Sequence, residues 1–125
     1  MERTNLATGA KWESIVGYSR AVKIGNQIEV SGTTSIKDGE VYGETAYDQT
    51  KHILFIISDA IEKLGGKMEN VVRTRIFTTN IALWEEIGRA HGEVFQNIRP
   101  ATTMVEVSAL IDLKMLVEIE AIAVV

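Results

Sequence analysis

The chain has 125 residues, of which 46% are hydrophobic and 24% charged, with a formal net charge of −4. This size suits a single domain over residues 1–125. The acidic balance argues against a dedicated nucleic-acid binder, which normally presents a basic surface. The absence of cysteine excludes disulfides, thiolate metal sites and cysteine nucleophiles. No apolar run approaches the roughly 18 residues of a membrane span and no signal peptide is evident, so we expect a cytoplasmic protein without a membrane partner.

Residues 19–32 predict a β-hairpin. Two runs of alternating apolar residues flank Gly25-Asn26, a pair that favours a tight turn. The stretch that follows is rich in glycine and charge and predicts a loop. A short additional strand is expected at Arg3–Leu6.

Residues 46–64 predict a helix. Apolar side chains recur with helical spacing, Thr45 is the expected N-cap, and Gly65-Gly66 end the segment. Phe55 falls on the polar side of this helix. It is therefore either a single exposed aromatic or a contact with another subunit or a terminal segment.

The second half of the chain adds a strand, a helix and two further strands. The expected ranges are 70–80, Leu83–Phe95, Thr102–Val107 and Leu116–Val124. Strand–helix–strand units favour parallel neighbours with right-handed crossovers, which places both helices on the same face of one mixed sheet. The predicted fold is an α+β sandwich of two layers.

Alternation along the strands predicts which side chains face the helices. The row toward the helices is expected to contain Val72, Ile76, Val105, Val107, Val117, Ile119, Ala121 and Ala123. The opposite row is expected to contain Arg73, Arg75, Phe77, Met104, Glu106, Glu118, Glu120 and Ile122. This second face is either solvated, with weak ion pairs, or covered by other copies of the chain, which its large apolar side chains favour. In a covered face, a cleft between subunits is the natural place for a small-molecule site.

Few residues carry an obvious chemical signature. His52 and His91 lie on different predicted helices without ligand-spaced partners, so no metal site is predicted. His91, on an apolar helix face, is either a satisfied core or interface histidine or a catalytic group. Glu118, near the start of the last strand, is either a general base that holds a water molecule or a structural partner of an arginine.

Three segments carry a resemblance to a known family: "GYSRAVKIGNQIEVSGTT", "VVRTRIFTTNI" and "RPATTMVEVSALIDLKMLVEIEAIAV". In this order and spacing the chain resembles the Rid family, also called the YjgF/YER057c/UK114 family. The resemblance implies a chorismate-mutase-like fold and a homotrimer with clefts between subunits. The best-known members hydrolyse enamines and imines such as 2-aminoacrylate to a 2-keto acid and ammonia, without a cofactor.

The resemblance also implies site residues. The family's cleft tyrosine matches Tyr18, and the serine and glycine that end the hairpin match Ser31 and Gly32. The strand glutamate matches Glu118, the expected catalytic residue. Substrate contacts are further expected from Thr102 and Met104, which share one strand.

Two positions depart from the family pattern. Gly88 stands where the family has an asparagine, and Thr102 stands where the deaminating members have an arginine. That arginine binds the substrate carboxylate bidentately, and its loss is expected to cost on the order of 2–5 kcal/mol of affinity. Another residue would have to replace this arginine as the carboxylate ligand. The candidates are His91 and Arg99, whose side chain would have to curl back past the proline.

Two main functions therefore remain open. The first is a divergent imine or enamine deaminase with weakened or altered activity toward 2-aminoacrylate-type substrates. The second is a non-catalytic trimer that binds a small molecule or a protein partner in the same cleft. An endoribonuclease or translation inhibitor is a weaker alternative, because the chain is acidic and nucleic-acid binding is not expected.

Overall fold

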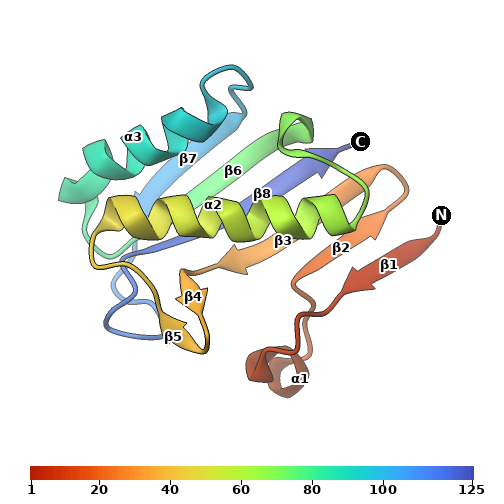
Figure 1. Ribbon diagram of the computed structural model, residues 1–125, viewed down its shortest axis with the longest axis horizontal. Coiled ribbons are helices and arrows are strands. Elements are labelled where there is room, and N and C mark those ends of the chain that lie inside the picture. The colour runs from red at the N-terminus through yellow and green to blue at the C-terminus, as the bar shows by residue number, and fades with distance from the viewer.

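The computed structural model describes residues 1–125 and confirms the two-layer α+β architecture. A six-stranded mixed sheet has the order β1-β2-β3-β8-β6-β7, and two helices, α2 and α3, cover one of its faces (Figure 1). The strands are β1 (Arg3–Leu6), β2 (Ala21–Ile24), β3 (Gln27–Thr33), β6 (Val71–Thr78), β7 (Ala101–Glu106) and β8 (Val117–Val124). The helices are α2 (Ala46–Lys63) and α3 (Trp84–Phe95).

The connections follow the predicted strand–helix–strand logic. β6 and β7 are parallel neighbours joined through α3, whereas β8 lies antiparallel between β3 and β6. Helix α2 therefore joins β3 to β6 across the position of β8. The core lies between the helices and the sheet, and no helix is both long and apolar enough to cross a bilayer.

Helix α2 has the predicted start. The Thr45 side chain accepts a hydrogen bond from the Asp48 backbone N–H at 3.0 Å, as an N-cap residue does. Gly65, which follows the helix, has a φ of 89°, a left-handed conformation that glycine adopts without strain. Phe55 is 69% exposed on the outer side of the helix, and its ring stacks on that of His52 at 6.1 Å between centroids.

The predicted facing of the sheet is correct for β8 and partly wrong for β6 and β7. In β8 the side chains of Val117, Ile119, Ala121 and Ala123 are buried, whereas those between them are half-buried. Val72 is 47% exposed, because a bulge between residues 71 and 73 turns Val71 into the core instead. Val105 is 42% exposed, whereas Met104 packs against the core, because the parallel register places Met104 beside buried Ile76.

The face of the sheet away from the helices carries both charge signs. Arg75 forms an ion pair with Glu120 at 3.6 Å, and Arg73 donates a hydrogen bond to the Thr103 hydroxyl at 2.8 Å. Phe77 lies between Glu118 on β8 and Val105 on β7 in the strand register. Coverage of this face by other copies of the chain, in a homotrimer, stays a prediction.

The structure also contains short elements that the sequence patterns did not predict. Helix α1 (Lys11–Val16) lies before β2, a small hairpin joins β4 (Ile36–Lys37) to β5 (Glu40–Val41), and 3-10 turns span Met68–Asn70 and Ile81–Leu83. The Glu13 carboxylate fixes α1 to the segment before it, because it accepts hydrogen bonds from the Thr8 backbone N–H and hydroxyl. Helix α1 and the β4–β5 hairpin border a pocket.

Candidate functional site

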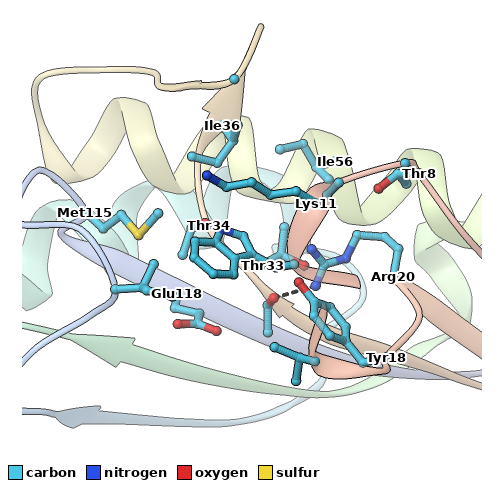
Figure 2. Close-up of a pocket in the computed structure, with 17 residues that line it drawn as sticks. Thr8, Lys11, Tyr18, Arg20, Thr33, Thr34, Ile36, Ile56, Met115 and Glu118 are labelled. Carbon is cyan, nitrogen blue, oxygen red and sulfur yellow. Dashed lines mark hydrogen bonds between the residues drawn. The ribbon is translucent and has the colours of Figure 1, made fainter. Parts of the chain in front are cut away.

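A pocket of about 850 Å³ opens where α1, the end of β3 and the start of β8 meet. In the view of Figure 2, Tyr18 and Arg20 lie on one side of this pocket, and Met115 and Glu118 lie on the other. Its apolar lining consists of Trp12, Val16, Ile36, Ile56, Ile111 and Met115 together with Ala10 and the Tyr18 ring. A pocket of this size, with apolar walls and a few polar groups, suits a small organic ligand.

Glu118 and Gly32 are in close contact at this pocket. A Cβ atom built on Gly32 would lie 2.1 Å from the Glu118 Oε2 atom, far inside van der Waals contact. Only glycine at position 32 leaves room for the carboxylate as it is placed. The two residues that the family resemblance assigned to the site are therefore brought together.

The environment of Glu118 favours its neutral form. Burial raises the pKa of the Glu118 carboxyl group above its usual value, Arg20 opposes this shift, and Glu120 adds to it. No arginine or lysine nitrogen forms an ion pair with Glu118. A carboxyl group with a raised pKa is a candidate for general acid–base catalysis.

Tyr18 and Arg20 are neighbours in this pocket. The Arg20 guanidinium lies 5.8 Å from the centre of the Tyr18 ring, and its Nη2 atom donates a hydrogen bond to the Gly32 carbonyl oxygen. Sequence reasoning identified Tyr18 but missed Arg20, Lys11 and Trp12, which line the pocket too. The signal for Arg20 was its position two residues after Tyr18, within the segment "GYSRAV".

Ser31 does not line this pocket, although Gly32 does. The Ser31 hydroxyl donates a hydrogen bond to the Ser19 carbonyl oxygen at 2.6 Å. That bond joins the end of β3 to the segment before β2. In this chain Ser31 supports the backbone around the pocket.

Thr102 lies in a different region, beside α3. Its hydroxyl is 2.7 Å from the hydroxyl of Thr74, which in turn is 3.0 Å from His91 Nε2. Thr102 also donates to the Pro100 carbonyl oxygen at 3.1 Å, so Thr74 donates to Thr102 and His91 Nε2 carries the proton that Thr74 accepts. Burial lowers the pKa of His91, consistent with a neutral ring in this chain of hydrogen bonds.

The other residues considered near Thr102 are also outside the pocket. Met104 packs against the core, and Arg99 donates through Nε to the Gln96 carbonyl oxygen at 3.0 Å, at the end of α3. Arg99 therefore does not reach back to the Thr102 position in this structure. Gly88 lies in α3, where a Cβ would meet no atom within 4 Å.

Thr102 and Glu118 point to opposite sides of the sheet. Thr102 shares its row with fully buried Thr74, on the helix side, whereas Glu118 lies between the helix-facing residues Val117 and Ile119. A single ligand cannot contact both side chains within one copy of the chain. Nor does any group of three or more histidine, cysteine, aspartate or glutamate side chains gather as metal ligands do.

Comparisons with known proteins identify the family of this chain. Residues 8–125 match the family model described as Endoribonuclease L-PSP. The crystal structure of Rv2704 from Mycobacterium tuberculosis, a member of the YjgF/YER057c/UK114 family, superimposes with a TM-score of 0.93 at 46% identity, covering 99% of this chain and 100% of that one. An uncharacterised Streptomyces coelicolor protein, SCO2049, is 39% identical over 90% of this chain and 85% of its own. The chloroplastic Reactive Intermediate Deaminase A of Arabidopsis thaliana is 29% identical over 85% of this chain and 57% of its own.

Proposed function

We propose that this chain, which belongs to the Rid (YjgF/YER057c/UK114) family, hydrolyses imines or enamines at a cleft between copies of the chain. The observation that carries the proposal is the placement of Glu118. It is a half-buried carboxyl group with a raised pKa, it lines a large pocket, and it lies against a glycine. The name of the Arabidopsis relative, Reactive Intermediate Deaminase A, supports the same reaction class.

The reaction needs one group that both gives and takes protons. With an enamine, neutral Glu118 protonates the carbon atom and produces the iminium ion. The Glu118 carboxylate then takes a proton from water as the hydroxyl adds to the iminium carbon, and Glu118 passes this proton to the nitrogen of the carbinolamine. Ammonia leaves with the electron pair of the C–N bond while the Glu118 carboxylate takes the hydroxyl proton, which leaves a carbonyl compound and neutral Glu118.

The cleft between copies follows from the separation of the two groups of site residues. Glu118, Gly32 and Tyr18 belong to one pocket, whereas Thr102 and Met104 lie on the other side of the sheet, on the edge strand β7. A site that contains both groups requires one group from each of two copies. This supports the homotrimer as part of the proposal.

Thr102 is expected to weaken or alter activity toward 2-aminoacrylate-type substrates. Its hydroxyl is already engaged with Thr74 and the Pro100 carbonyl, and it carries no charge for a carboxylate. An arginine at the same position would add a charged, planar donor. The engaged hydroxyl also favours the second candidate function, a binding protein without turnover.

The test measures ammonia and 2-keto acid release from two freshly generated substrates, 2-aminoacrylate and the imine of 4-methyl-2-oxopentanoate. It compares the wild type with Glu118→Ala, Thr102→Arg and a control, Glu62→Ala, whose side chain is exposed on α2. We expect wild-type activity that Glu118→Ala abolishes and Glu62→Ala retains. We also expect Thr102→Arg to increase the 2-aminoacrylate rate.

Two results would contradict the proposal. Equal activity in the wild type and Glu118→Ala would remove Glu118 from the reaction. No release of ammonia or 2-keto acid from either substrate, in the wild type and in Thr102→Arg, would favour the binding protein without turnover.

A further inference from the structure

Arg20 is a half-buried cation without an acidic partner. None of the ion pairs in the structure includes Arg20. The only hydrogen bond of its side chain runs from Nη2 to the Gly32 carbonyl oxygen, and its Nε atom is buried without a partner. Charged groups that leave water are ordinarily paired, so an unpaired guanidinium needs an explanation.

The other arginines of the chain have no buried side-chain nitrogen without a hydrogen-bond partner. Arg75 and Arg89 form ion pairs with Glu120 and Glu93. Arg3, Arg73 and Arg99 donate to Asn5, Thr103 and Gln96. Arg20 is also the arginine that lines the large pocket, so its guanidinium lies beside a space that a ligand can fill.

The pocket places an apolar surface next to this cation. Trp12, Ile36, Ile111 and Met115 line it together with Arg20 and Glu118. Lys11 adds a second positive charge at its border. The arrangement suits a molecule with a small anionic head and an apolar body, because the head pairs with the guanidinium while the body leaves water.

We propose that Arg20 is the anion anchor of this pocket, and that its ligand is a small carboxylic acid with an apolar side chain. The proposal rests on the proposed function in that it uses the same pocket, and it names the residue that binds the substrate carboxylate there. Arg20 binds the carboxylate from the pocket side of Gly32, so that the anchor missing at Thr102 is supplied from the segment before β2. Tyr18 packs beside the guanidinium and Glu118 faces the carbon next to the carboxylate.

The geometry around Gly32 links the anchor to the reacting group. Gly32 contacts both side chains: its carbonyl oxygen accepts from Arg20, and its Cα lies under the Glu118 carboxylate. A carboxylate on Arg20 therefore places the neighbouring carbon atom near Glu118. It also neutralises the positive charge that opposes protonation of Glu118.

The test is a binding experiment with an unreactive probe, 4-methyl-2-oxopentanoate, and its uncharged amide, measured by isothermal titration calorimetry. We expect the wild type to bind the acid about 30-fold more tightly than the amide, the scale of a half-buried charge pair. In Arg20→Gln the affinity for the acid should fall about 30-fold, while the affinity for the amide should stay unchanged. Arg20→Lys should keep part of the preference, and Arg89→Gln, on exposed α3, should keep all of it.

A purely structural role for Arg20 would not make affinity depend on the charge of the ligand. Equal binding of acid and amide by the wild type, or no binding of either, would overturn the proposal, as would a preference for the acid that survives in Arg20→Gln. If Arg20→Gln does not fold, the wild-type comparison and Arg20→Lys decide. If the protein binds the acid through Arg20 but releases no ammonia, the proposed reaction is refuted and the role of Arg20 as anion anchor stands. Ammonia release with an unchanged KM in Arg20→Gln would refute the anchor and leave the reaction.

Discussion

The Glu118 carboxylate lies directly over the Cα atom of Gly32, so that a Cβ at residue 32 would come within 2.1 Å of Oε2 and 3.1 Å of Cδ. We therefore expect Gly32→Ala to move the Glu118 side chain out of its present position. The end of a glutamate is flexible, so the free energy of unfolding should fall by only about 1 kcal/mol. The rate of imine hydrolysis should fall much further, because a displaced base misses the reacting atom.

The matched control is Gly92→Ala, at a helical glycine of α3 where a Cβ meets no atom within 4 Å. Alanine there should raise the free energy of unfolding by up to about 1 kcal/mol, through helix propensity, and leave hydrolysis unchanged. Thermal melts and steady-state rates measure both effects. Full activity in Gly32→Ala would show that the contact does not position Glu118 for the reaction.

The raised pKa of Glu118 predicts a pH-dependent cost in stability. The folded chain holds this proton more tightly than the unfolded chain, so the favourable contribution is present below the unfolded pKa of about 4.3 and is lost as pH rises through the folded pKa. Glu118→Gln removes the titration. Its free energy of unfolding relative to the wild type should therefore increase between pH 4 and neutral pH, as measured by urea unfolding at several pH values. A difference that is constant over this range would contradict the assigned pKa shift.

The main elements of the fold were predictable because their signals are local. The helix of residues 46–63 carries its own periodicity and its own cap at Thr45, and β8 alternates without interruption. The facing of Val72 was not predictable, because the bulge beside it depends on pairing with β8. Met104 was placed on the wrong side because the edge strand β7 takes its register from β6, and valines at 105 and 107 look equally suited to the core.

The candidate site was predictable only where a family motif marks it. Tyr18, Gly32 and Glu118 meet in one pocket as the motif implied. Arg20 was missed because its position directly before β2 does not reveal that its side chain lines the pocket. Its unpaired state appears only when the positions of all carboxylates are known.

The burial of His91, whose ring bonds to Thr74, predicts a second pH effect. Burial lowers the pKa of His91, so below its usual value of about 6.5 the unfolded chain binds this proton more readily than the folded chain. Stability therefore falls as pH drops from about 6.5 toward the folded pKa of His91. His91→Gln should flatten this part of the stability profile in urea unfolding. An unchanged slope would show that His91 does not titrate differently in the two states.

Thr74→Val tests the same network at constant pH. The substitution keeps the shape of a fully buried side chain and removes the hydroxyl that joins His91 to Thr102. Leaving the buried His91 N–H without an acceptor should lower the free energy of unfolding by about 1–3 kcal/mol. Thr4→Val, at an exposed threonine of the edge strand β1, is the control and should change it by less than about 0.5 kcal/mol. Equal losses in the two variants would show that the network adds no stability of its own.

The homotrimer prediction depends on which layer of the sandwich, the sheet or the helices, forms the interface with the other copies of the chain. Val105 is 42% exposed on the sheet face away from the helices, beside Phe77, whereas Phe55 is 69% exposed on the outer side of α2. If the sheets face one another in a trimer, Val105→Lys buries an unpaired charge and should shift the assembly toward monomers in sedimentation velocity at micromolar concentration. Phe55→Lys should leave the trimer intact. A stable wild-type monomer would contradict the homotrimer, and dissociation caused by Phe55→Lys alone would place the interface on the helices instead.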